Sequence, residues 1–211
     1  MKKKKIVLLL FAVISIFTLP QAAAGDGKQN TSKFIYHGAG NPYLPLWEHL
    51  PDGEPRVFED PDNPGKFRAY IIGSHDVRFG SYCGPDIRMW SAPVEDLSSW
   101  RDEGPIFTYQ VGGQWDVMYA PDLVEVKRKD GTKEYYLFPH SRGRDREAMV
   151  AKGSRPDGPF TPINLTADGT KTLPGSILGF DPSVYIEYIT DPNDPDLSLI
   201  HISEPTRHSL I

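Results

Sequence analysis

Three carboxylate residues of this chain lie next to a proline, and the intervals between them are similar. They are Glu54 before Pro55, Asp122 after Pro121, and Asp181 before Pro182. The first two prolines are 66 residues apart and the last two are 61 apart. Because proline lacks a backbone donor and limits strand pairing, an acid beside it can point away from a sheet. Carboxylates brought together in this way suit glycosidic-bond cleavage, in which one group activates water and another protonates the leaving oxygen.

The segments around these acids repeat in the same order. Strand-like runs are expected at 53–58, 67–72, 87–92 and 100–106, again at 119–124, 134–138, 148–152 and 157–160, and a third unit opens at 179–186. Each unit therefore predicts four short strands joined by tight turns, as the 19 glycines and 20 prolines also indicate. Such units stack as the blades of a β-propeller. A β-sandwich with similar strands is the alternative.

In a propeller the first strand of every blade lines the central channel, so acids on these strands would converge on one axis. Three carboxylates in register favour a catalytic site over the alternative that each acid only caps a turn.

The motifs of both units resemble glycoside hydrolase family 43. They are GEPRVF at 53–58, YIIGSHD at 70–76, YAPDLVEV at 119–126, EYYLFPHS at 134–141 and GFDPSVYI at 179–186. This resemblance covers roughly residues 40–190. It implies an all-β, five-bladed propeller glycosidase that acts on arabinose- or xylose-containing polymers and inverts the anomeric carbon. About the first two blades and the start of the third would be present.

The resemblance also implies roles for the three acids. Glu54 matches the general base, a position where the family usually has Asp. Asp181 matches the carboxylate that tunes the pKa of the general acid, and Asp122 matches a residue that lines the channel beside the substrate. The family's general acid, a glutamate, is expected beyond Ile186 and is not identified here.

Five further residues are candidates for substrate binding. Tyr119 and Phe180 flank the acids and could stack on a sugar ring, although propellers also bury aromatic residues between blades. His140 and Ser141 follow the second strand of the second unit, and His75 lies at the corresponding place in the first. No metal and no other cofactor is predicted.

The N-terminus predicts export. Four lysines precede an apolar stretch over residues 6–19, and three alanines at 22–24 would allow cleavage before Gly25. The apolar stretch is short for a membrane span, so no stable membrane anchor is expected. Loss of residues 1–24 would move the formal charge from −5 to −9. An acidic exported protein is a poor candidate for nucleic-acid binding and is compatible with a carbohydrate partner.

The remaining boundaries follow from composition. Residues 25–33 are polar and are expected to be a disordered lead-in, and 34–196 are expected to form the N-terminal part of the propeller domain. Residues 197–207 resemble the translation of a transposase-type sequencing adapter, so 197–211 are expected to be a non-native tail and the chain itself to be inactive. A non-catalytic carbohydrate-binding propeller is the alternative function. A propeller phosphorylase would need a basic phosphate pocket, which the sequence does not show.

Overall fold

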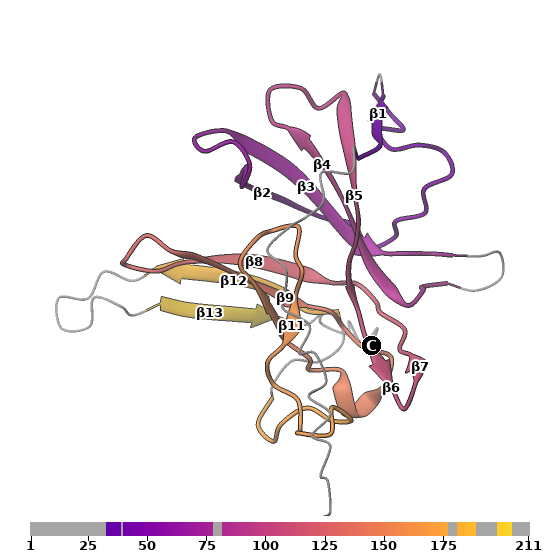
Figure 1. Cartoon of the computed structure of the whole chain (residues 1–211), viewed down its shortest axis with the longest axis vertical. Coiled ribbons are helices and arrows are strands. Elements are labelled where there is room, and N and C mark those ends of the chain that lie inside the picture. Colours follow the sequence, from indigo (N-terminus) through magenta and orange to yellow (C-terminus); the bar gives the residue numbers. More distant parts are fainter. Residues whose placement is uncertain (1–32, 39, 78–81, 177–180, 189–197, 204–211) are drawn as a thin grey trace, which may run out of the picture. The chain divides into compact units, whose positions relative to one another are not determined.

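The computed structural model describes residues 33–38, 40–77, 82–176, 181–188 and 198–203. All of them belong to the unit Lys33–Ile211. They form antiparallel sheets, and their one helical element is a 3-10 turn, η1 at Arg144–Arg146 (Figure 1). The predicted signal peptide, and all but one residue of the predicted lead-in, lie outside the described residues.

The first sheet has the strand order β1-β5-β4-β3-β2. Its strands are β1 (Ile35–His37), β2 (Glu54–Glu59), β3 (Phe67–Ser74), β4 (Asp86–Pro93) and β5 (Ser99–Thr108). Four of them follow one another in sequence and in space, as predicted. The fifth, β1, was not predicted: it pairs with β5 at the far edge, with Ile35 opposite Arg101.

The second sheet has the order β11-β10-β9-β8. Its strands are β8 (Asp122–Lys127), β9 (Lys133–Phe138), β10 (Ala151–Gly153) and β11 (Thr161–Pro162). The same succession of neighbours recurs, so the predicted repeat of four-stranded units is confirmed. Three elements differ from the prediction: β8 begins at Asp122 rather than residue 119, β10 begins at Ala151 rather than residue 148, and β11 comprises Thr161–Pro162 rather than residues 157–160. The short hairpin of β6 (Gln110–Val111) and β7 (Gln114–Trp115) was not predicted.

A third sheet consists of β12 (Ser183–Tyr188) and β13 (Ser198–Ser203), paired along their whole length. The strand β12 opens the predicted third unit, and β13 lies within the segment predicted to be a non-native tail. That prediction concerns the origin of the segment and stays a prediction. The first strand of the second unit, β8, contacts both β2 and β12, so the first strands of all three units are neighbours.

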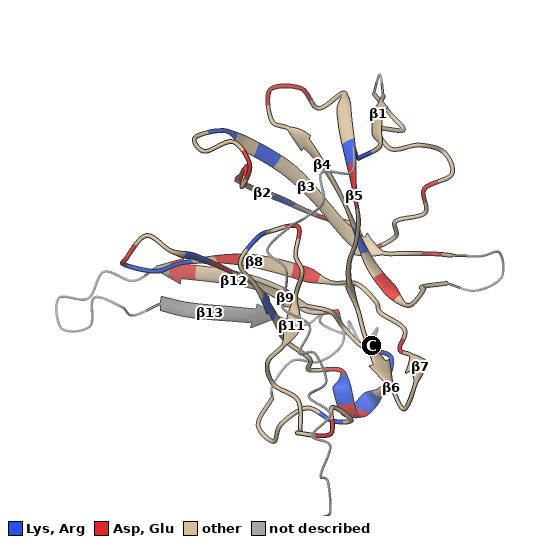
Figure 2. Ribbon diagram, viewed as in Figure 1, with Lys and Arg blue, Asp and Glu red and all other residues tan. Residues whose placement is uncertain are grey.

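The main core lies between the first two sheets. It joins residues of both units: Phe58, Tyr70, Ile72, Ile87, Met89, Ile106 and Phe107 from the first, and Met118, Leu123, Tyr135, Leu137, Met149, Ala151 and Phe160 from the second. The centroid of the Phe58 ring lies 5.7 Å from that of Tyr70 in its own sheet and 5.4 Å from that of Tyr135 in the second sheet. Each fully buried apolar side chain of this size contributes about 1.5–3 kcal/mol. Charged residues of both signs are interspersed on the sheets (Figure 2).

A second cluster covers the other face of the first sheet. Trp90 and Trp100 are buried there, and Leu44 and Leu50 of the preceding loop pack on them. The strand β3 is buried over most of its length for this reason, since apolar side chains cover both of its faces. The loop over residues 40–53 is thus held on the sheet by packing, and it leads directly into β2.

Candidate active site

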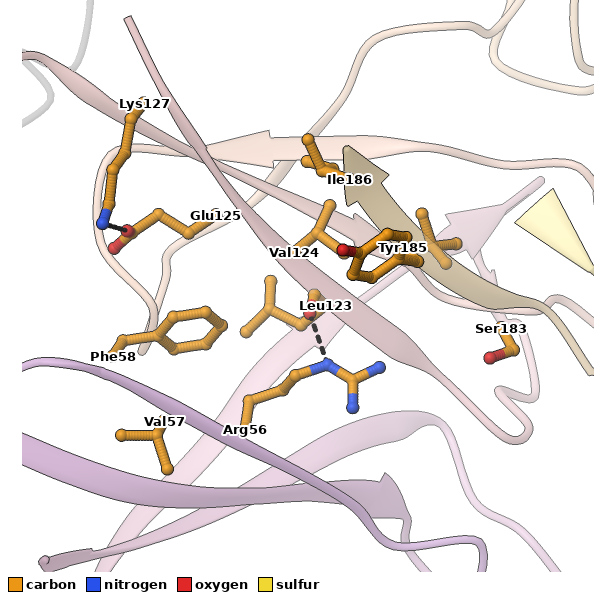
Figure 3. A pocket seen from close by; sticks show the side chains of 11 residues that line it. Arg56, Val57, Phe58, Leu123, Val124, Glu125, Lys127, Ser183, Tyr185 and Ile186 are labelled. Atoms are coloured by element: carbon orange, nitrogen blue, oxygen red, sulfur yellow. Dashed lines mark hydrogen bonds and ion pairs between the residues drawn. The ribbon is translucent and has the colours of Figure 1, made fainter. Parts of the chain in front are cut away.

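A groove of about 540 Å³ runs along the first strands of the three units (Figure 3). Its lining comes from β2, β8 and β12: Arg56, Val57, Phe58, Leu123, Val124, Glu125, Lys127, Ser183, Val184, Tyr185 and Ile186. Arg56 reaches across the groove, and its Nε donates to the carbonyl oxygen of Leu123 at 3.0 Å. The predicted acids lie at or just before the N-terminal ends of these strands: β2 begins at Glu54, β8 begins at Asp122, and Asp181 precedes the start of β12 by two residues.

Asp122 ties the three strands together. Its side chain is 0% exposed, and Oδ1 accepts from Arg56 of β2 and from the backbone N–H of Leu123. Its other oxygen, Oδ2, accepts from the backbone N–H of Val184 on β12 at 2.6 Å. Burial raises the pKa of Asp122, while the Val184 hydrogen bond and the Arg56 charge oppose that rise. Both oxygens are engaged within the protein, so its predicted contact with substrate stays a prediction.

Glu54 is the first residue of β2 and its side chain is 38% exposed. Arg56 donates to its Oε2 at 3.0 Å, and the same guanidinium also binds Asp122. The carboxylate predicted as general base is therefore paired with a cation along its own strand.

Asp181 and His140, which are both predicted site residues, lie next to each other. The Nδ1 atom of His140 is 3.5 Å from Oδ1 of Asp181, and it is also 3.5 Å from the backbone nitrogen of Asp181. Burial lowers the pKa of His140, and the charge of Asp181 opposes this fall. Burial also raises the pKa of Asp181, the His140 charge opposes this rise, and the charge of Asp52 adds to it.

Asp52 is a carboxylate near Asp181 that the sequence analysis missed. It is exposed, and its Oδ2 accepts a hydrogen bond from Ser74 Oγ at 3.1 Å. The sequence did contain a signal for this residue, because Asp52 directly follows a proline, Pro51, in the chain. Its charge acts on Asp181 and on Cys83, whereas the charge of Glu54 acts on Asp122. Asp52 is thus a charged neighbour of Asp181, and Glu54 is a charged neighbour of Asp122.

The backbone around Asp52 and Asp181 has an unusual conformation. Asp52, Cys83 and Asp181 have φ angles of 54°, 59° and 50°, and they are the only non-glycine residues with positive φ in the described part of the chain. Side chains other than glycine rarely adopt this region, and such residues concentrate at functional sites. The electrostatic influence of both aspartates on Cys83 shows that all three lie in one neighbourhood.

Tyr119 is half-buried and contacts two other rings. Its ring stacks on Tyr82 with a centroid distance of 5.9 Å and an interplanar angle of 22°. Its ring also meets His140 at 5.4 Å and 61°. The structure therefore joins the predicted residues Tyr119, His140 and Asp181 in one row, and adds Tyr82 to it.

The other predicted binding residues lie apart or are engaged elsewhere. His75 Nδ1 is 2.9 Å from Asp86 Oδ2, and this hydrogen bond raises the pKa of His75. Ser141 is buried and donates to Asp116 at 2.6 Å. Phe180 lies outside the described residues. The described ranges contain no group of three or more metal-ligating side chains and no helix able to cross a membrane.

The loop that carries Asp52 is fixed by a buried carboxylate, Glu48. Its side chain is 1% exposed, Oε2 accepts from Trp90 Nε1 at 2.6 Å, and Arg88 Nε lies 3.0 Å away. Further along the loop, Pro51 passes close to Gly73 of β3. A Cβ atom at Gly73 would lie 2.7 Å from the carbonyl oxygen of Pro51, so glycine is required at this position. These contacts set the position of the Asp52 backbone.

We expect Glu48→Gln to lower the free energy of unfolding by about 2–3 kcal/mol, because the amide removes the charge that faces Arg88 in a buried site. Urea denaturation of the 211-residue chain measures this loss. Glu95→Gln is the matched control, since Glu95 is exposed. Equal midpoints for the two variants would contradict the anchoring role of Glu48.

Fold and site together define an all-β protein of repeated antiparallel sheets. The loops and strand ends that open successive units bring Asp52, Asp181, His140 and a tyrosine pair into one neighbourhood.

The chain is 39% identical over 157 residues to a protein named xylosidase/arabinosidase from Thermoclostridium stercorarium. The match covers 70% of this chain and 30% of that relative, so the chain spans about a third of the relative's length. This finding confirms the resemblance to glycosidases that the sequence motifs predicted. No known family profile matches the chain.

A solved structure also shows a likeness. It is a mutant β-fructofuranosidase from Microbacterium saccharophilum K-1, with 19% sequence identity and a TM-score of 0.36 over 70% of this chain and 31% of that one. A likeness at this TM-score does not define a fold.

Proposed function

We propose that this chain is the N-terminal part of an exported β-propeller glycoside hydrolase of family 43. The complete protein hydrolyses O-glycosidic bonds in arabinose- or xylose-containing polysaccharides or oligosaccharides. The observation that carries the proposal is the 39% identity, over most of this chain, to a protein named for both activities. The same observation favours a hydrolase over a carbohydrate-binding propeller without catalysis.

The sheet arrangement supports the propeller. Each of the first two units is a run of four antiparallel strands, and the first strand of each lies next to the first strand of the following unit. In a propeller these strands surround the channel, and the remaining blades close the circle. A two-unit fragment leaves the channel open along β2 and β12, which is where the groove lies.

Inversion at the anomeric carbon needs an ionised base that takes a proton from water and an acid that protonates the leaving oxygen. We assign the base to Asp52, with Glu54 as the alternative. Asp52 is exposed, its carboxylate accepts a hydrogen bond from Ser74, and its charge acts on Asp181. Glu54 instead faces Arg56, which holds its carboxylate in an ion pair.

Asp181 fits the role of the carboxylate that tunes the general acid. Its negative charge, when it is ionised, would raise the pKa of an acid placed across the channel by a following blade. The His140 ring beside it restricts its orientation, because the Asp181 backbone N–H donates to Nδ1 of that ring at 3.5 Å. The site then holds water on the Asp52 side and the leaving group on the far side of the sugar.

The experiment that tests this function follows product stereochemistry. The full-length protein, given an aryl β-xyloside or an aryl α-arabinoside, should release a sugar whose first-formed anomer is opposite to that of the substrate. Time-resolved proton NMR distinguishes the two anomers before mutarotation. A first product with the same anomer as the substrate would reject the inverting mechanism. No release from either substrate or from natural xylan and arabinan would favour the carbohydrate-binding alternative.

A further inference from the structure

Tyr82 presents an exposed aromatic ring to solvent, and the charges of Asp52 and Asp181 act on the residue that follows it, Cys83. The residue is 74% exposed, yet its ring is stacked on Tyr119 at 5.9 Å and 22°. Burial raises the pKa of Tyr119, and the neighbouring Tyr82 adds to this rise. One face of Tyr82 is therefore supported from behind while the residue as a whole stays open to solvent.

Backbone bridges join the three chain segments that carry the stacked rings and His140. Outside the named strands, Met118 bridges Gly84 on one side and Ser141 on the other. The backbone N–H of Tyr119 donates to the carbonyl oxygen of His140 at 2.8 Å. Three segments from the two sheets thus lie side by side, and they carry Tyr82, Tyr119 and His140 in order.

The segment next to Tyr82 is also fixed. The backbone N–H of Cys83 donates to Asp76 Oδ1, and Cys83 adopts a left-handed φ of 59°. A Cβ atom at Gly84 would lie 2.6 Å from the carbonyl oxygen of His75, so the two backbone segments are too close for any residue other than glycine. A ring that is already ordered before a ligand arrives loses little conformational entropy on binding.

The charge around the ring limits what it can bind. Asp52, Asp76 and Asp181 act together on Cys83, the residue that follows Tyr82, and Arg142 acts on Tyr119 behind the ring, so acidic groups outnumber basic ones here. An acidic surrounding disfavours anionic ligands such as uronic acids. A neutral pyranose with equatorial hydroxyls has axial C–H bonds on both faces, and these fit the negative face of an aromatic ring. The exposed flat ring favours such a pyranose over a puckered furanose.

We propose that Tyr82 is a substrate-positioning residue, on whose ring a neutral xylopyranosyl unit stacks beside the Asp52 and Asp181 carboxylates. This inference rests on the proposed function and deepens it, because it assigns the pyranose class of sugar to a surface already formed in this chain. Tyr119 supports the platform from behind, and His140 holds Tyr119 in place through their edge-to-face contact.

The test uses xylobiose and the 211-residue chain itself, with binding measured by isothermal titration calorimetry and by saturation-transfer NMR. We expect Tyr82→Ala to weaken binding by about tenfold or more, the loss that removal of one stacking contact produces. Tyr82→Phe keeps the ring and should bind within about threefold of the unchanged chain. Phe67→Ala is the control, because Phe67 is 50% exposed at the opposite end of the first sheet.

Three results would overturn the inference. They are unchanged binding by Tyr82→Ala, failure of the unchanged chain to bind xylobiose, and binding of α-1,5-linked arabinobiose as tight as that of xylobiose. None of these results decides whether the full-length protein hydrolyses a glycoside, which the stereochemical assay measures independently. A failure of the platform and a failure of the proposed function are therefore distinguishable.

Discussion

Replacement of Asp52 or Asp181 by Asn in the full-length protein should lower kcat/KM on an aryl xyloside by about 10²–10⁴-fold, the usual contribution of a group that moves or directs a proton. Asp52→Asn removes the base that we assign, and Asp181→Asn removes the charge that would keep the general acid protonated. Initial rates at several pH values measure both effects. Asp181→Asn should also shift the alkaline limb of the pH profile to lower pH, because the general acid would lose its proton more readily.

Glu54→Gln is the matched control for this prediction, since it neutralises the other acid of the same loop and strand. We expect its activity to fall by less than about tenfold. Thermal unfolding of all three variants should stay close to that of the unchanged protein, because these carboxylates are partly or fully exposed. A large loss with Glu54→Gln and a small one with Asp52→Asn would return the role of base to Glu54.

Asp122→Asn should lower the free energy of unfolding by about 3 kcal/mol, although the two side chains have nearly the same shape. Both oxygens of Asp122 accept hydrogen bonds, from Arg56 and Leu123 at one and from Val184 at the other. An asparagine must turn its amide nitrogen toward one of these donors. Either orientation leaves a buried donor unsatisfied at the junction of three strands.

Urea denaturation of the 211-residue chain measures this effect, with Asp145→Asn as the carboxyl-to-amide control. The side chain of Asp145 is 63% exposed, so its variant should match the unchanged chain within about 0.5 kcal/mol. A loss below about 0.5 kcal/mol for Asp122→Asn would show that the three strands do not depend on this carboxylate.

Much of the fold could be predicted because strand-forming runs and turn residues alternate within each unit. The turn at Asp60–Gly65 and the following run from Phe67 illustrate this, and β3 begins at Phe67 as expected. The strand β1 could not be predicted, since three residues carry no periodicity and its partner β5 lies more than sixty residues later. The shift of β8 coincides with a change of register: Met118 bridges Ser141, whereas Asp122 pairs with Phe138, which is one residue out of step.

The candidate site was predicted less completely than the fold. Adjacency to proline found Glu54, Asp122 and Asp181, but it could not rank them, because solvent access and pairing depend on neighbouring strands. Asp122 satisfies the same pattern as Asp52, yet one is buried at a strand junction and the other is exposed on a loop. The stack of Tyr82 on Tyr119 joins residues 37 positions apart, a distance at which no sequence period indicates contact.

The pairing of β1 with β5 has a practical meaning for anyone who shortens this protein. The strand β1 pairs with the outer edge of β5, so the backbone groups at that edge are hydrogen-bonded within the sheet. A version that starts after His37 would present the backbone groups of β5 to solvent, and an open strand edge recruits strands from other molecules. The safe starting point for expression is therefore before Lys33, even though the acids and tyrosines of the candidate site lie farther along the chain.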